Sequence, residues 1–481
     1  MQPNRFILIV LIIFLLPCIL QAQVSAVPKE REAVSYHTGQ FQGQSIEYKA
    51  EVKEYFFRLH GVGAPAVSAM ATSYIKTNNK VERPVIFIFN GGPGASSSPL
   101  HLNAFGPMRI QQENDSPVLK DNPYCLLDQA DLVFIDPPGT GFTRIFDSTA
   151  AKEFWDVRRD ALLFIELIAK WRIEHQRLSA PVYICGESYG TIRAAMISGS
   201  AGDLHISGVI FLSSVFDMSI VAEAPGNDIP YILFLPSMAA TAWYHKKADP
   251  SFKSAAEAYE AAIRFGLNEY IMALAKGINL PQKEKENVAA GLARLIGLPI
   301  DSILSKDLRI SNTNFELMLL AKENKRIGQL NGQATGPLYT PGVKPPFDDP
   351  SFNLRPSTRG IAGRYFNEYL QFADTAAYKT LNLGVNSRWN WKSMAERIGY
   401  STVTPQLIGA MNTNPQLHFL VAGGLYDLAT PLYAARYILE HSGIDPSRIT
   451  YANYPTGHSI FENEEELIKL RNKVADLIRK R

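Results

Sequence analysis

The sequence predicts an α/β protein in which helices cover a mostly parallel, doubly wound sheet, with a mainly helical cap inserted into the core. Two observations carry this prediction. Short apolar segments that end in glycine-rich loops alternate with amphipathic segments from residue 85 to about 213, and again from 417 onward. Between them this alternation stops, and the pattern is mainly helical. We therefore expect core segments at 27–214 and 376–481, and a cap at 215–375.

Each expected element follows from its local pattern. Continuous apolar runs are typical of strands buried on both faces, and they occur at 85–89, 131–136, 182–185, 208–213, 417–422 and, more briefly, 449–451. Alternation at 45–59 and 72–76 predicts antiparallel strands at one edge of the sheet. Helices are expected in the core at 155–176, 191–196, 432–440 and 464–480, and in the cap near 230–245, 252–276, 284–296 and 314–325.

The most informative motif is Gly-Glu-Ser-Tyr-Gly at residues 186–190, where the strand 182–185 runs into a helix of small residues. A G-x-S-x-G sequence at a strand–turn–helix junction is the nucleophile elbow of α/β-hydrolases. The turn is so tight that side chains at the glycine positions would clash, while the Ser188 hydroxyl projects above the sheet. A Gly-Ser turn on a core strand is the alternative, and the flanking pattern argues against it. The expected fold is therefore the α/β-hydrolase fold.

A serine hydroxyl needs a histidine to accept its proton and a carboxylate to orient that histidine. In α/β-hydrolases these groups follow the chain order Ser, Asp, His, each on a loop at the C-terminal end of a strand. Asp427 follows the strand 417–422, and His458 follows the strand 449–451. Taken alone, an Asp in a loop is usually a turn former or helix cap, and a lone His is more often a surface or structural residue. Together, in this order, they predict the catalytic triad Ser188–Asp427–His458.

An oxyanion hole requires backbone N–H groups directed at the place where negative charge develops. One donor should be Tyr189, which directly follows the nucleophile. The other should come from the Asn-Gly-Gly-Pro-Gly loop at residues 90–94, whose glycines allow close approach of the backbone. We assign this second donor to Gly92. A purely structural glycine–proline turn is the alternative.

Composition argues against several other classes of function. The 48 Lys and Arg residues nearly balance the 46 Asp and Glu residues, and no basic stripe occurs, so no nucleic-acid partner is expected. The histidines other than His458 are scattered without the spacing of metal ligands, and no cofactor motif is present. We therefore expect neither a metal nor a cofactor. The sequence does not decide the oligomeric state, and a homodimer is compatible with it.

Residues 1–26 predict a signal peptide. Arg5 supplies positive charge, and residues 6–20 form an apolar stretch that is short for a membrane span. Cleavage is expected after Ala26, with Ala22 as the competing site, and an uncleaved anchor is the alternative. No later segment is long and apolar enough to be a membrane helix. We expect an exported protein, periplasmic or secreted, with no stable membrane insertion after cleavage.

Cysteine and sequon content narrow the source of the protein. Cys125 and Cys185 remain after cleavage, and Cys185, in the elbow strand, should be a buried apolar residue. A single disulfide is compatible with export, but the spacing does not require one. The Asn-x-Ser/Thr sequon at 114–116 is the only one in the chain, which favours a bacterial enzyme over a heavily glycosylated eukaryotic product.

Five short stretches together resemble the serine carboxypeptidase family, the group of carboxypeptidase C and cathepsin A. They are Asn-Gly-Gly-Pro-Gly-Ala-Ser-Ser at 90–97, Gly-Pro at 106–107, Asp-Asn-Pro-Tyr at 121–124, Asp-Pro-Pro-Gly-Thr-Gly-Phe at 136–142 and the elbow at 186–190. The resemblance covers about residues 85–215 and 417–461, whereas the cap is poorly matched. It implies a bacterial-type member of the family that removes C-terminal residues from peptide substrates through an acyl-enzyme, often best at acidic pH.

The resemblance also implies a site for the substrate's terminal carboxylate. In that family, the asparagine that opens the N-G-G-P-G loop and the glutamate before the nucleophile bind this group, and here they are Asn90 and Glu187. A carboxylate binds beside a carboxylic acid only while the acid keeps its proton, so binding should weaken as pH rises. A structural hydrogen bond behind the elbow is the alternative role for Glu187.

The sequence departs from the family pattern in ways that leave other activities open. Ala104 stands where many members place a second glutamate, Ala95 replaces the usual cysteine, and most of the family's disulfide set is missing. Gly190-Thr191 is similar to proline-iminopeptidase and tripeptidyl-aminopeptidase relatives, which share a G-G-P-G loop. The alternatives are an aminopeptidase, an esterase or acyltransferase that uses the same acyl-enzyme, and a non-enzymatic binding protein on this fold.

Overall fold

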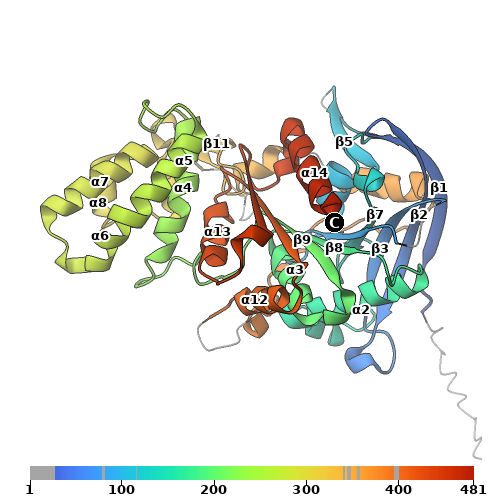
Figure 1. The fold of residues 1–481 in the computed structure, drawn as a ribbon. Helices are drawn as coiled ribbons and strands as arrows, with labels where there is room; N and C mark the ends of the chain where they lie inside the picture. Colours follow the sequence, from blue (N-terminus) through green and yellow to red (C-terminus); the bar gives the residue numbers. More distant parts are fainter. Residues whose placement is uncertain are drawn as a thin grey trace, which may run out of the picture.

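A nine-stranded sheet runs through the centre of the molecule, and a group of helices extends from one end of it (Figure 1). The computed structural model describes residues 28–78, 82–114, 116–339, 342–343, 348–354, 358–394 and 400–480. The predicted signal peptide, residues 1–26, lies outside the described residues. Within the ranges just given, no helix has the length and apolar character needed to cross a membrane.

The sheet is mostly parallel with an antiparallel edge, as the sequence predicts. In spatial order its strands are β1 (Glu32–Phe41), β2 (Gln44–Phe57), β3 (Val67–Lys76), β7 (Asp131–Asp136), β4 (Val85–Phe89), β8 (Val182–Glu187), β9 (Ile206–Leu212), β12 (His418–Gly424) and β13 (Ile449–Tyr454). The pairs from β1 to β7 are antiparallel, and those from β7 to β13 are parallel. The carboxyl ends of β4, β8, β12 and β13 therefore meet at one edge of the sheet.

Helices cover both faces of this sheet. Alternate residues of β4 show why: Phe87 and Phe89 belong to one apolar core, whereas Ile86 and Ile88 belong to the other. The first core is closed by α2 (Val157–Glu174), α3 (Tyr189–Ser200) and α12 (Thr404–Thr413). The second is closed largely by α14 (Glu464–Arg479), which lies across the opposite face (Figure 1). This two-sided burial explains the continuous apolar runs of the central strands.

The edge strand β1 and the hairpin of β5 (Met108–Glu113) and β6 (Ser116–Asp121) are among the β elements that the sequence-based expectation lacks, as are the short strands β10 (Lys325–Ile327) and β11 (Thr335–Pro337). Strand β1 is a half-exposed edge strand, so its sequence holds no continuous apolar run. The hairpin of β5 and β6 is likewise mostly polar and stands outside the main sheet. Both escape a search that relies on runs of apolar residues.

The cap helices pack around an apolar core of their own. They are α4 (Ile229–Tyr244), α5 (Ala255–Phe265), α6 (Ile271–Lys276), α7 (Gln282–Ile296), α8 (Ile300–Ser305) and α9 (Asn312–Met318). They form the lobe at the left of Figure 1. The short strands β10 (Lys325–Ile327) and β11 (Thr335–Pro337) pair after them.

The last part of the predicted cap packs elsewhere. Helix α10 (Thr358–Arg364) and the π-helical turn Tyr365–Tyr369 contribute Tyr365 and Phe366 to the core under the sheet, where they meet residues of β3 and β7. The hydroxyl groups of Tyr74 and Tyr365 form a hydrogen bond of 2.7 Å inside this core. The cap boundaries at 215 and 375 therefore remain a prediction from the sequence.

Both cysteines in the described part of the chain are buried and unpaired. Cys185 lies in β8, as expected for an apolar filler of the central strand. Cys125 precedes the turn Leu126–Asp128 and lies in the core beneath the sheet. Burial raises the pKa of both thiols, which keeps them protonated and unreactive.

Candidate active site

Ser188 occupies the sharp turn between β8 and α3. Its backbone has φ 60° and ψ −129°, a conformation that residues other than glycine rarely adopt. Thr191 secures the turn, because its N–H and hydroxyl donate to the Ser188 carbonyl at 2.8 and 2.7 Å. A Cβ atom at Gly186 would collide with the carbonyl of Gly190. This crowding is the physical reason for the glycines of the motif.

His458 and Asp427 form a buried pair on loops that follow β13 and β12. His458 Nδ1 lies 2.8 Å from Asp427 Oδ2, and Asp427 is fully buried. The carboxylate also accepts hydrogen bonds from the N–H groups of Ala429 (2.8 Å) and Thr430 (3.0 Å) and from the Thr430 hydroxyl (2.8 Å). A carboxylate on Nδ1 selects the tautomer with its proton there, which leaves Nε2 as the proton acceptor.

Ser188 and His458 line one cavity of about 680 Å³ between the core and the cap. Its core side includes Asn90, Gly92, Glu187, Ser188, His458 and Ser459. Its cap side includes Thr313, Glu316, Leu317, Arg326, Gln329 and Leu330. The predicted nucleophile, base and carboxylate-binding residues therefore open onto the same space, which is large enough to hold a peptide end.

The loop after β4 lies directly against the elbow. A Cβ atom at Gly91 would meet the backbone nitrogens of Tyr189 and Gly190, so only glycine fits here. Neither the Gly92 N–H nor the Tyr189 N–H donates a hydrogen bond to another residue that the structure describes. Both N–H groups are thus uncommitted among the described residues, and their assignment to an oxyanion hole stays a prediction.

Asn90 and Glu187 are neighbours in the cavity. The Asn90 side-chain amide donates to Glu187 Oε2, and Ser459 Oγ donates to Glu187 Oε1 at 3.2 Å. Asn90 Oδ1 in turn accepts from the N–H of Leu100 at 3.1 Å. Asn90 and Glu187 are both buried. The two residues that the family resemblance pairs are thus brought together at one wall of the site.

Ala104 lies apart from that wall. It is fully buried in the apolar core beneath the sheet, and its carbonyl accepts a hydrogen bond of 2.8 Å from the Asn122 side chain. It does not line the cavity. No second carboxylate approaches Asn90 and Glu187 from this position.

A buried ion pair supports the elbow from behind. Arg193 on α3 donates to both carboxylate oxygens of Asp160 on α2, at 2.7 and 3.2 Å, and to the Asn90 carbonyl at 2.8 Å. The Tyr189 hydroxyl donates to the same Asp160 at 3.0 Å. Burial raises the pKa of Asp160, and Arg193 opposes this effect. The network joins the elbow and the loop after β4 to one rigid support.

The segment after β4 is fixed at its far end by Asp136. One oxygen of this carboxylate accepts from the N–H and the hydroxyl of Ser97, both at 2.7 Å. The other accepts from the Tyr378 hydroxyl at 2.8 Å. Burial raises the pKa of Asp136, while these hydrogen bonds lower it. The Asp-Pro-Pro-Gly stretch thus holds the segment after β4 in place through Asp136.

Sequence reasoning did not identify the contributions of Thr430, Asp160 and Arg193, or of Glu316 and Arg326 in the cap. The first three support the elbow and the Asp427–His458 pair from outside the recognised motifs. The two cap residues lie in a region that matches the family motifs poorly, so no local sequence motif identifies them as site residues.

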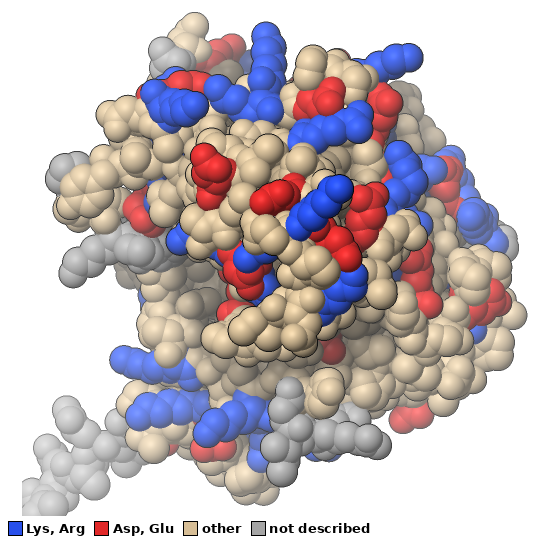
Figure 2. All heavy atoms as spheres, turned by 90° about the vertical axis from the view of Figure 1, so that its left-hand side faces the viewer, with Lys and Arg blue, Asp and Glu red and all other residues tan. Residues whose placement is uncertain are grey.

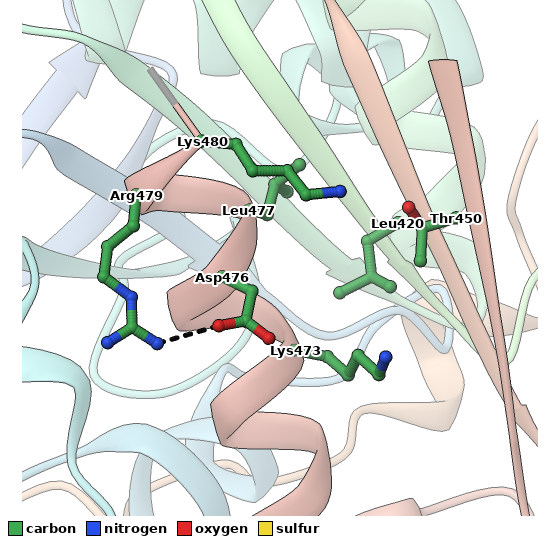
Figure 3. A pocket seen from close by; sticks show the side chains of 7 residues that line it. All are labelled: Leu420, Thr450, Lys473, Asp476, Leu477, Arg479 and Lys480. Atoms are coloured by element: carbon green, nitrogen blue, oxygen red, sulfur yellow. Dashed lines mark hydrogen bonds and ion pairs between the residues drawn. The ribbon is translucent and has the colours of Figure 1, made fainter. Parts of the chain in front are cut away.

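A second cavity, of about 380 Å³, lies between α14 and strands β12 and β13 (Figure 3). Lys473, Arg479 and Lys480 border it, and Arg479 forms an ion pair of 2.8 Å with Asp476. It contains none of the predicted site residues. Positive and negative side chains are intermixed on the face that the cap lobe presents (Figure 2). Over the described ranges, no group of three or more His, Cys, Asp and Glu residues is arranged to hold a metal ion.

Comparison with known proteins agrees with the resemblance seen in the motifs. Residues 72–200 match the family model described as serine carboxypeptidase. The pheromone-processing carboxypeptidase kex1 of Sclerotinia sclerotiorum is 36% identical over 114 residues, which are 22% of this chain and 16% of that protein. Serine carboxypeptidase-like 9 of Arabidopsis thaliana is 34% identical over 131 residues, 26% of this chain and 29% of that protein. The matched segments thus span less than a third of these two relatives.

The fold is also that of a solved relative. The crystal structure of a prohormone-processing carboxypeptidase, Kex1, from Saccharomyces cerevisiae aligns over 89% of this chain and 91% of its own, with a TM-score of 0.53 and 16% sequence identity. The α/β-hydrolase fold predicted from the elbow and the strand pattern is confirmed. The resemblance to serine carboxypeptidases is likewise confirmed over residues 72–200.

Proposed function

From the match of residues 72–200 to serine carboxypeptidases, we propose that this chain is a serine carboxypeptidase, which hydrolyses the C-terminal bond of peptides through an acyl-enzyme on Ser188. The observation that carries the proposal is one cavity that joins the strained Ser188 elbow, the Asp427–His458 pair and the Asn90–Glu187 pair. The first two supply nucleophilic catalysis, and the third supplies recognition of a chain end.

In the proposed reaction, His458 Nε2 removes the Ser188 hydroxyl proton as Oγ attacks the C-terminal peptide carbonyl. Asp427 holds the histidine by Nδ1 and stabilises the imidazolium that forms. The N–H groups of Gly92 and Tyr189 stabilise the oxyanion. The tetrahedral intermediate collapses, and the imidazolium gives its proton to the departing amino group. Water, deprotonated by His458, then attacks the acyl-enzyme and releases the shortened peptide.

Asn90 and Glu187 are proposed to bind the terminal carboxylate of the substrate. When Glu187 is protonated, its hydroxyl can donate to that carboxylate, while the Asn90 amide supplies a second donor. When Glu187 is ionised, two like charges face each other and binding weakens. Activity on peptides with a free C-terminus is therefore expected to decline as pH rises.

The test compares an N-blocked dipeptide that has a free carboxylate with the same dipeptide amidated at its C-terminus, from pH 4 to 8. We expect release of the C-terminal amino acid from the free acid, a weaker reaction with the amide and a decline at higher pH. Ser188→Ala protein is the control and should release nothing. Equal cleavage of both peptides, or cleavage that persists in Ser188→Ala, would contradict the proposal.

One observation favours an aminopeptidase as the second candidate. Ala104 stands in place of the second family glutamate, and it lies in the apolar core outside the cavity. The clamp for a terminal carboxylate is therefore smaller than in many family members. Faster turnover of free-amine peptides than of N-blocked ones, with release from the N-terminus, would support this candidate. Turnover of simple esters alone would instead support an esterase or acyltransferase.

Export is proposed on the pattern of residues 1–26 alone: a positive residue, an apolar stretch and a small-residue cleavage site. On this basis the mature enzyme acts in the periplasm or outside the cell, on peptides present there. Mass spectrometry of protein isolated from the producing cell would test it. A mature N-terminus just after Ala22 or Ala26 is expected, and an intact N-terminus on cytoplasmic protein would contradict export.

A further inference from the structure

The cap side of the catalytic cavity carries ionisable residues that the proposed mechanism does not use. Glu316 lies on α9, Arg326 on β10, and Asp348 and Asp349 on the segment before the turn Pro350–Leu354. All four line the cavity that contains Ser188. Whether they can bind a substrate depends on the hydrogen bonds and ion pairs that they already form within the protein.

Only one of the two carboxylate oxygens of Glu316 has a hydrogen-bond partner in the described part of the chain. The residue is 3% exposed, and Oε2 accepts a hydrogen bond of 3.2 Å from Arg326. Its other oxygen, Oε1, is buried and has no hydrogen-bond partner in the described part of the chain. An unpaired buried carboxylate oxygen costs free energy, and it requires an explanation in a folded protein. In a cavity that must admit a substrate, a donor on that substrate is the natural partner.

The charges around Glu316 are unbalanced toward the negative. Arg326 is the only Lys or Arg among the described residues that line the cavity, and it is shared between Glu316 and Asp348, each at 3.2 Å. Asp349 instead accepts from backbone N–H groups, including that of Ser351 at 2.8 Å. Among the described lining residues, one cation thus faces three carboxylates on the cap side of the cavity.

The ionisation of Glu316 agrees with this imbalance. Burial, with smaller contributions from Asp349 and Glu223, raises its pKa to about 7 even though Arg326 opposes them. The single guanidinium does not compensate for the lost hydration of the carboxylate. A second positive charge next to Oε1 would do so.

We propose that Glu316 binds a cationic group of the substrate, so that the enzyme prefers peptides with a Lys or Arg side chain, or a free α-ammonium group, near the scissile bond. The proposal rests on the proposed peptidase function. An ammonium or guanidinium group donates charge-assisted hydrogen bonds, which are the strong ones in a buried setting. An apolar side chain would leave Oε1 unpaired, and an acidic one would add a fourth negative charge.

The test measures kcat/KM for matched peptide pairs that differ only in one positive charge. N-blocked peptides carry Lys or the neutral norleucine on either side of the scissile bond, and a further pair has a free or an acetylated N-terminus. We expect the wild type to favour the cationic member at least tenfold in one of these pairs. The pair that responds identifies the source of the cation as a side chain or the α-ammonium group.

Glu316→Gln should lower that preference to threefold or less. The matched control is Glu269→Gln, which changes an exposed cap glutamate and should leave the preference unchanged. Asp348→Asn is the second variant if Glu316→Gln does not fold, and it should reduce the preference without abolishing it. Equilibrium binding of the same peptides to Ser188→Ala protein gives a second readout, in which the Lys peptide should bind more tightly.

Three results would overturn the cation site: no preference for the charged member of any pair, an unchanged preference in Glu316→Gln, or a preference for peptides with an acidic residue. The last would assign recognition to Arg326 instead. These results are separate from the failure of the proposed function. Ser188-dependent release of C-terminal norleucine would uphold the carboxypeptidase even if the cation site failed. Release only from free N-termini would contradict the carboxypeptidase but would leave a cation site for the α-ammonium group in place.

Discussion

At the scale of single residues, the orientation of His458 depends on a small group of donors around Asp427. His458 Nδ1, the Thr430 hydroxyl and two backbone N–H groups all contact this buried carboxylate. The Thr430 hydroxyl also lies 3.2 Å from His458 Nδ1 and 3.0 Å from the Ser213 carbonyl oxygen. The carboxylate therefore has no freedom to turn away from the histidine.

Asp427→Asn is expected to lower kcat by about 10³-fold or more, because an amide can present its N–H to Nδ1 and favour the wrong tautomer. Thr430→Val removes one of several supporting hydrogen bonds and should lower kcat by about tenfold or less. Steady-state kinetics on one N-blocked dipeptide compares the two variants. Equal, small effects from both would show that Asp427 does not orient the catalytic base.

Glu316 gives a prediction for stability against pH. In the folded protein, the pKa of Glu316 is raised from the ordinary value of 4.5 to about 7, with burial as the largest cause. Asp349 and Glu223 also raise it, whereas Arg326 lowers it. Between these values the unfolded chain releases a proton that the folded protein keeps, so folding stability falls as pH rises from about 4.5 to about 7. Above and below this window, Glu316 adds no pH dependence.

Glu316→Gln removes this effect, so its Tm minus that of the wild type should increase between pH 4.5 and pH 8. Thermal unfolding of both proteins at intervals of half a pH unit measures the difference. Glu269→Gln, the exposed control on the cap, should show a constant Tm difference. A constant difference for Glu316→Gln as well would show that Glu316 titrates normally.

At the scale of elements, the site is held where strands, helices and cap meet. The Leu330 carbonyl, on the cap loop after β10, accepts from the His458 N–H at 2.6 Å. The same loop contacts the Asp427 side through a hydrogen bond from the Leu428 N–H to the Gln329 carbonyl at 3.0 Å. The cap thus braces the loops that carry Asp427 and His458, in addition to lining the cavity.

Asp349 organises this bracing loop by accepting the N–H groups of Gln329 and Leu330 at 3.2 Å. Asp349→Ala leaves these groups without their acceptor, and we expect kcat to fall by about tenfold through displacement of His458. KM for neutral peptides should change less. Crystallography or His458 NMR signals would show whether the ring moves. An unchanged kcat would mean that the catalytic loops are rigid without the cap.

The Asp160–Arg193 pair links α2, α3 and the end of β4. Arg193→Met should destabilise the protein by about 3–5 kcal/mol, because it leaves a buried carboxylate without its cation. Asp160→Asn combined with Arg193→Met should recover part of this loss, since neither buried charge remains. Denaturant unfolding of the single and double variants measures the coupling. Strictly additive losses would contradict the role of the pair.

At the scale of the whole molecule, the core could be predicted from sequence and the cap's contribution to the site could not. Ser188 lies in a motif whose own glycines encode the turn. Asp427 and His458 follow strands that can be recognised in the sequence as apolar runs. Glu316 and Arg326 reach the same cavity only because α9 and β10 fold back over the core. That placement depends on contacts distant in sequence, which local patterns do not encode.

The resemblance to known carboxypeptidases follows the same division. It covers residues 72–200, where the loop after β4 and the elbow lie, and not the cap. The chemistry of the site is therefore expected to be that of the family, whereas the choice of substrate is expected to be this chain's own. The roles of Ser188, Asp427, His458, Gly92, Tyr189, Asn90 and Glu187 remain predictions that the geometry supports.

The most direct test of the central claim is the order in which residues leave a longer peptide. A ten-residue peptide incubated with wild-type and Ser188→Ala protein would be followed in time by mass spectrometry. A ladder of successive losses from the C-terminus, present with the wild type and absent with Ser188→Ala, is the predicted result. Losses from the N-terminus, cuts within the peptide, or a ladder that survives Ser188→Ala would contradict the account.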